Sequence, residues 1–140
     1  GLMIVDLPVE EDKELFLEAE KNNLRFIRLI TPTTNLERVR KITKNAKGFI
    51  YYVAVAGITG TKSALKKDVE KKIKQIKTIT NLPIIIGFGI KKPSQATEMS
   101  KLGNGIVIGS SLVEKIKKTK SFSKITNECI NFVKTFATKF

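Results

Sequence analysis

The sequence predicts an α/β fold in which parallel strands alternate with helices. Apolar runs of strand length recur along the 140 residues, and an amphipathic segment with helical periodicity follows each run. The runs are nearly continuous, as they are in strands whose two faces are both covered. This alternation implies parallel strands joined by right-handed crossovers within one structural unit, residues 1–140.

Five strands are expected, and each ends in turn-forming residues. They cover Leu2 to Val5, Leu24 to Ile30, Phe49 to Val55, Ile84 to Ile86 and Ile106 to Ile108. Two architectures fit such a set: an open doubly wound sheet, or a piece of a barrel. Five strands cannot close a (β/α)₈ barrel, which takes about 250 residues in full. A barrel piece would leave two strand edges unpaired, so the isolated chain is expected to be marginally stable or to self-associate.

Helices are expected between and after the strands, from apolar residues spaced three and four apart. They cover roughly Glu10 to Asn22, Leu36 to Asn45, Lys67 to Thr80, a segment that begins near Pro93, a short segment after Ser110, and Phe122 to the end. Thr34 or Asn35 is a candidate cap for the second helix. Cys129 is expected to be a small core residue of the last helix.

Composition narrows the function classes. At 41% hydrophobic, the chain is too apolar for intrinsic disorder. No apolar run approaches the roughly 20 residues of a membrane-spanning helix, and no signal peptide opens the chain, so a cytoplasmic location is expected. The net charge of +13 fits a basic nucleic-acid-binding module. However, the lysines are dispersed along helix faces without interleaved aromatic residues, which favours solvated surfaces and no nucleic-acid partner.

Glycine-rich strand ends predict a phosphate-binding site. In either architecture the site lies at the carboxyl ends of the strands. Gly87-Phe88-Gly89 follows the fourth strand, and Gly109-Ser110-Ser111 leads from the fifth strand directly into a helix. The free amides and the dipole of a helix N-terminus attract a phosphate. Tight turns alone would explain one such glycine motif, but two on successive strands favour phosphate binding.

The sequence offers few groups for acid–base chemistry. It contains no histidine, so a histidine base or a histidine metal site is excluded, and no metal site is expected. Of the thirteen acidic residues, only Asp6 falls at a strand end. Asp6 is either a catalytic group or the cap of the turn that follows it. The chain is therefore expected to hold a phosphate without supplying the acid and base of a reaction.

Several motifs together resemble the tryptophan synthase α subunit family. They are, in order, Val5-Asp6-Leu7-Pro8-Val9-Glu10-Glu11, Phe49-Ile50-Tyr51-Tyr52-Val53, Gly57-Ile58-Thr59-Gly60, Leu82-Pro83-Ile84, Gly87-Phe88-Gly89-Ile90 and Gly105-Ile106-Val107-Ile108-Gly109-Ser110. The resemblance implies a TIM (β/α)₈ barrel, present here as about five βα units, the fourth to eighth strands. Residues 1–140 would then be the carboxy-terminal part of a single barrel domain.

The resemblance also implies a lyase of tryptophan biosynthesis, which cleaves indole-3-glycerol phosphate to indole and glyceraldehyde 3-phosphate by a retro-aldol reaction. By that match, the phosphate would be bound by Gly60, Phe88, Gly89, Gly109 and Ser110. The indole pocket would be lined by Leu29 and Tyr51, and Thr59 would support the mobile loop after the sixth strand. Val55 departs from the family, since some members carry arginine there. The family's catalytic glutamate and aspartate would precede Gly1, so this chain alone is expected to be inactive.

The resemblance implies one protein partner and no cofactor of the chain's own. In that family a β subunit holds pyridoxal phosphate, the two subunits form an α₂β₂ complex, and the loop at Asp6-Leu7-Pro8 would face the partner. Two other functions stay open. One is another phosphate-binding barrel enzyme, such as an indole-3-glycerol-phosphate synthase or a histidine-pathway cyclase. The other is a basic, non-enzymatic α/β module that binds nucleic acid.

Overall fold

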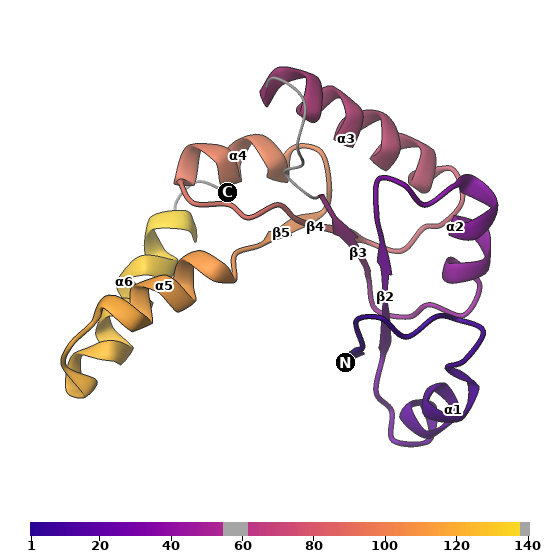
Figure 1. The fold of residues 1–140 in the computed structure, drawn as a ribbon, viewed down its shortest axis with the longest axis horizontal. Helices are drawn as coiled ribbons and strands as arrows, with labels where there is room; N and C mark the ends of the chain where they lie inside the picture. Colours follow the sequence, from indigo (N-terminus) through magenta and orange to yellow (C-terminus); the bar gives the residue numbers. More distant parts are fainter. Residues whose placement is uncertain (55–61, 138–140) are drawn as a thin grey trace.

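The structure is a computed structural model that describes residues 1–54 and 62–137, with residues 62–65 described by their backbone alone. Its centre is a parallel sheet whose strands lie side by side in chain order (Figure 1). They are β1 (Leu2–Met3), β2 (Phe26–Ile30), β3 (Ile50–Val53), β4 (Ile84–Gly87) and β5 (Gly105–Val107). A doubly wound sheet reverses its strand order at a switch point. The unbroken order therefore identifies a barrel segment and rules out the open doubly wound sheet.

The helices follow the strands around one side of the sheet (Figure 1). They are α1 (Lys13–Lys21), α2 (Leu36–Thr43), α3 (Lys62–Lys77), α4 (Pro93–Ser100), α5 (Ser110–Lys118) and α6 (Phe122–Ala137). The expected cap of α2 is confirmed, since the Asn35 side chain accepts a hydrogen bond from the Arg38 amide at 2.8 Å. Cys129 in α6 was expected in the core, but it is half-buried.

Several boundaries differ from the expected ones because local hydrogen bonds end or delay an element. The first helix begins at Lys13 instead of Glu10, since the Glu11 amide donates to the Pro8 carbonyl in a turn (3.0 Å). Strand β1 stops before the turn at Asp6, whose φ is 65°. Strand β2 starts at Phe26 because the Leu24 amide still donates to the Ala19 carbonyl of α1 (2.8 Å). Helix α3 starts earlier than Lys67, and ends before Thr80.

The two faces of the sheet are buried to different degrees, and this places the site. Alternate residues of β2, β3 and β4 are buried and pack against the helices in one apolar core, to which the sheet contributes Ile30, Ile50, Tyr52, Ile84 and Ile86. The intervening side chains are half-buried and lie on the opposite face, which is the interior side of a barrel. Leu29 and Tyr51 lie on that face as register partners.

The core tyrosine predicts a loss of stability at alkaline pH. Tyr52 is 1% exposed, and burial together with the negative charge of Asp68 raises its pKa to about 12. An unfolded phenol titrates near 10, so the unfolded chain loses this proton first. The free energy of unfolding should therefore fall as the pH rises from about 10 to about 12. Urea unfolding at pH 8 and 11 should show a smaller decline for Tyr52→Phe, while equal declines would contradict this account.

Candidate functional site

A pocket of about 330 Å³ lies where β3, β4 and β5 end. Its wall comes from three consecutive strand ends, namely Tyr51, Val53 and Ala54, then Gly87, Phe88 and Gly89, then Val107, Gly109 and Ser110. Five of the predicted site residues, Tyr51, Phe88, Gly89, Gly109 and Ser110, therefore line one cavity. Their assembly follows from parallel pairing, which brings the carboxyl ends of adjacent strands to the same edge of the sheet.

Two glycines shape this pocket for different reasons. Gly89 has a φ of 61°, a left-handed conformation that favours glycine, and a Cβ atom there would have no described residue within 4 Å. Gly87 lies under the Tyr51 ring. A Cβ atom on Gly87 would come within 2.6 Å of Tyr51 Cζ and 2.8 Å of Cε1, which is closer than real Cβ atoms approach. The Tyr51 ring can cover this part of the pocket only because residue 87 has no side chain.

The amino terminus of α5 provides hydrogen-bond donors at the mouth of the pocket. The Leu112 and Val113 amides donate to the Gly109 carbonyl at 3.0 and 3.1 Å. The amides of Ser110 and Ser111 precede them and have no acceptor within the helix, as at every helix start. They carry the positive end of the dipole of a nine-residue helix. A phosphate is the kind of ligand that such a terminus binds.

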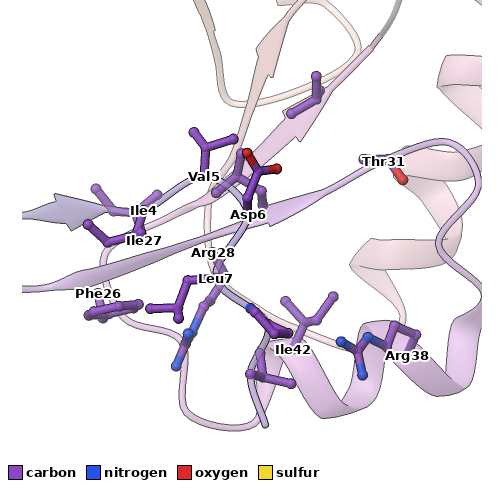
Figure 2. Close-up of a pocket in the computed structure, with 14 residues that line it drawn as sticks. Ile4, Val5, Asp6, Leu7, Phe26, Ile27, Arg28, Thr31, Arg38 and Ile42 are labelled. Carbon is purple, nitrogen blue, oxygen red and sulfur yellow. The ribbon is translucent and has the colours of Figure 1, made fainter. Parts of the chain in front are cut away.

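Leu29 lines a neighbouring pocket of about 480 Å³, formed by β2 and the loop after β1. The two predicted indole residues therefore line different pockets, Leu29 this one and Tyr51 the pocket with the predicted phosphate residues. Val53 lines both pockets, so the two are adjacent. Asp6 also lines the second pocket and is exposed. Its positive φ is several-fold more frequent for aspartate than for most other non-glycine residues. Figure 2 shows the Asp6 carboxylate pointing away from the Arg28 guanidinium.

Two residues of this region were not anticipated from the sequence. Arg28 and Asp12 are 6% and 5% exposed and form a buried ion pair. The guanidinium also lies 4.4 Å from the Phe26 ring centre and 5.7 Å from that of Phe16. The one signal in the sequence was an arginine inside an otherwise apolar strand. The pair ties the end of the loop after β1 to the middle of β2.

A second ion pair holds the same loop to α2. Glu10 accepts two hydrogen bonds from the Arg38 guanidinium, one of them 2.9 Å long. The hydrogen bond from Arg38 lowers the pKa of the Glu10 carboxyl, which therefore stays ionised to a lower pH than usual. The segment from Asp6 to Asp12 is thus anchored at two points.

Val55 and the motif Gly57-Ile58-Thr59-Gly60, both named in the sequence analysis, lie outside the described part of the chain. Over residues 1–54 and 62–137, histidine, cysteine and acidic side chains form no group of three that could hold a metal ion. Over the same ranges, the helices are too short or too polar to cross a membrane.

Comparisons with known proteins agree with one another. The tryptophan synthase alpha chain of Thermoanaerobacter sp. (strain X514) is 41% identical over 133 residues, which make up 95% of this chain and 50% of that protein. The solved tryptophan synthase subunit alpha from Campylobacter jejuni is 40% identical, with a TM-score of 0.83. That match covers 91% of this chain and 51% of the solved one.

The alpha chain from Legionella pneumophila subsp. pneumophila is 26% identical, with a TM-score of 0.78 over 98% of this chain and 50% of its own. This chain therefore spans about half the length of the relatives that it matches. The family model for the tryptophan synthase alpha chain matches residues 1–139. Because that match covers nearly every residue, the chain belongs to the tryptophan synthase alpha chain family.

Proposed function

We propose that this chain supplies the phosphate- and indole-binding half of a tryptophan synthase α active site. The whole protein would be a lyase that cleaves indole-3-glycerol phosphate to indole and glyceraldehyde 3-phosphate in the cytoplasm. One observation carries the proposal: Tyr51, Phe88, Gly89, Gly109 and Ser110 line a single pocket at the ends of adjacent parallel strands. Tyr51 and Phe88 make one part of its wall aromatic, and the start of α5 supplies backbone amides to another part. Such a wall suits a ligand that has both an aromatic ring and a phosphate.

In this proposal the phosphate binds at the start of α5. The amides of Ser110 and Ser111 and the Ser110 hydroxyl donate to its oxygens, while Gly89 lets the backbone after β4 approach closely. Gly60 completes the site from outside the described residues. The indole ring lies against Tyr51 and Leu29, with Phe88 beside the phosphate. Binding the two ends of the substrate fixes the bond between them for cleavage.

The acid and base of the reaction come from elsewhere in the proposed whole protein. A retro-aldol cleavage needs a base for the hydroxyl proton of the side chain and an acid to protonate the released indole carbon. No carboxylate is among the described residues around the phosphate pocket. We therefore expect the 140-residue chain to bind without cleaving. Thr59 would help to close the site, and no cofactor is needed in this subunit.

The proposed protein partner is a β subunit that holds pyridoxal phosphate. It would dock at the loop at Asp6-Leu7-Pro8, which lies in the anchored segment from Asp6 to Asp12. The two ion pairs of this loop, with Arg28 and Arg38, support the proposal because they fix its shape before a partner arrives. A pre-organised loop loses less conformational entropy on binding.

Glycerol 3-phosphate binding tests the proposed site directly. Titration calorimetry on the 140-residue chain should show saturable binding that inorganic phosphate competes away. Ser110→Ala should weaken it by roughly fivefold, the usual effect of one lost hydrogen bond. Ser94→Ala, on exposed α4 surface, is the matched control and should change nothing. Binding that Ser110→Ala leaves unchanged would place the phosphate elsewhere.

An activity test shows whether the catalytic acid and base lie outside this chain. The chain joined to the amino-terminal half of the Thermoanaerobacter alpha chain should form indole from indole-3-glycerol phosphate, and the 140-residue chain alone should not. Indole formation by the short chain would refute the claim that its acid and base lie elsewhere. A correctly folded, inactive chimera would argue against the lyase.

A further inference from the structure

Two consecutive serines begin α5, but their side chains have different surroundings. Ser110 is exposed and lines the phosphate pocket. Ser111 is half-buried, and its hydroxyl donates a hydrogen bond of 2.6 Å to the backbone carbonyl of Ile90. Ile90 lies in the segment after β4. The Ser111 hydroxyl therefore connects the two backbone segments that flank the pocket, which are twenty-one residues apart in the chain.

The acceptor of this hydrogen bond is held firmly in place. Ile90 is 1% exposed and belongs to an apolar cluster with Ala96, Met99 and Phe136. It directly follows Gly89, which has a positive φ and lines the pocket. Because the two residues are adjacent, a hydrogen bond that fixes the Ile90 carbonyl also restrains Gly89.

The segment is also fixed on its far side. The amides of Lys91 and Lys92 both donate to the Gln95 side chain, at 3.0 and 3.1 Å, which attaches the segment to the start of α4. The Ser111 hydroxyl supplies the corresponding attachment to the start of α5. The segment from Gly89 to Lys92 is thus hydrogen-bonded to the starts of both helices.

We propose that Ser111 is a positioning residue, whose hydroxyl sets the spacing between Gly89 and the α5 amides that bind the phosphate. This role rests on the phosphate site proposed above. A phosphate bound from two separate backbone segments requires donors at a fixed distance, and donors fixed before binding cost less to order. The hydroxyl faces the Ile90 carbonyl and not the pocket, so it acts through these segments and does not contact the ligand.

A pair of variants with the same shape isolates the hydroxyl. Ser111→Thr keeps the hydroxyl and Ser111→Val replaces it with a methyl group, while both add the same branching at Cβ. Glycerol 3-phosphate affinity, measured by calorimetry on the 140-residue chain, should fall roughly fivefold for Ser111→Val, because binding must then order the two segments, at a cost of about one immobilised side chain. Ser111→Thr should stay close to the unaltered chain.

A control and a second readout separate positioning from general stability. Ser100→Ala removes a serine hydrogen bond within α4, to the Thr97 carbonyl, and should leave the affinity unchanged. Amide hydrogen exchange of Gly89 to Lys92 should speed up in Ser111→Val and not in Ser111→Thr. Where Ser111→Val lowers the folded fraction, Ser111→Ala is measured in its place and should show the same loss of affinity.

The outcomes distinguish this role from the site itself. If the unaltered chain binds glycerol 3-phosphate and Ser111→Val binds equally well, Ser111 has no positioning role and the proposed site stands. If Ser111→Thr and Ser111→Val weaken binding equally, crowding and not the hydroxyl is responsible, and the proposal fails. If the unaltered chain is folded by circular dichroism and does not bind, the phosphate site is wrong and the role of Ser111 is wrong with it.

Discussion

Asp12→Ala should lower the free energy of unfolding by about 3–5 kcal/mol, the usual cost of breaking a buried ion pair by removing one partner. Both side chains of the pair are 7% exposed, so the Arg28 guanidinium would stay buried without its carboxylate. Among the described residues the Arg28 Nε has no hydrogen-bond partner, which leaves the Asp12 carboxylate as the main compensation for the charge of Arg28. Urea unfolding with linear extrapolation measures the change.

The same pair should be replaceable as a unit. In the double variant Asp12→Leu, Arg28→Met the buried charges are gone, and an apolar pair of similar volume is often neutral or stabilising. We expect this variant to regain most of the stability lost by Asp12→Ala. Glu18→Ala is the control, because its partner Lys21 is 72% exposed and such pairs contribute about 0–1 kcal/mol. Equal losses for Asp12→Ala and Glu18→Ala would show that burial of the pair has no energetic weight.

The Arg28–Asp12 ion pair shows what the local sequence pattern could not predict. The alternation of apolar runs and amphipathic segments correctly predicted all five strands and the helices between them. The partner of Arg28 was not predictable, because Asp12 lies sixteen residues away and their pairing depends on the path of the intervening turns. The predicted first helix began at Glu10, so Glu10 and Asp12 were expected in its first turn. In the structure both residues precede α1 and form ion pairs with distant arginines. Tertiary contacts here outweigh helix propensity.

Strand order could not be derived from the elements themselves either. A doubly wound sheet and a barrel segment have the same local alternation, and they differ only in which strands pair. The observed order from β1 to β5 decides for the barrel segment, in agreement with the fold of the relatives. The resemblance had already implied this fold, from motifs whose spacing is a property of one family.

The pocket was more predictable than its internal contacts. Parallel strands present their carboxyl ends together, so glycines after β4 and β5 had to meet near Tyr51. What the sequence could not indicate is which backbone atoms lie within hydrogen-bond distance. The bond from Ser111 to Ile90 depends on how closely two loops approach, and the position of the Tyr51 ring over Gly87 depends on strand register. Both are distances that only the folded chain defines.

Gly87→Ala should displace the Tyr51 ring and disrupt the pocket that it covers. The added methyl group would lie 2.6 Å from Tyr51 Cζ, inside the contact distance of real atoms. The ring, which is half-buried and packed along β3, has to move or the strands have to separate. Overpacking of this kind costs about 1–3 kcal/mol. Urea unfolding should show this loss, and indole binding, followed by NMR line shifts, should disappear.

When the Tyr51 ring is absent, Gly87→Ala should raise the free energy of unfolding instead of lowering it. In a Tyr51→Ala background the methyl group meets no ring, and alanine is favoured over glycine inside a strand by about 0.5–1 kcal/mol. A double-mutant cycle should therefore show strong coupling between residues 51 and 87. Gly109→Ala is the control for adding a methyl group at the pocket, because no atom of residues 1–54 or 62–137 lies within 4 Å of its Cβ position. If Gly87→Ala costs as much without the Tyr51 ring as with it, the clash is with the backbone, and Gly87 does not shape the pocket through Tyr51.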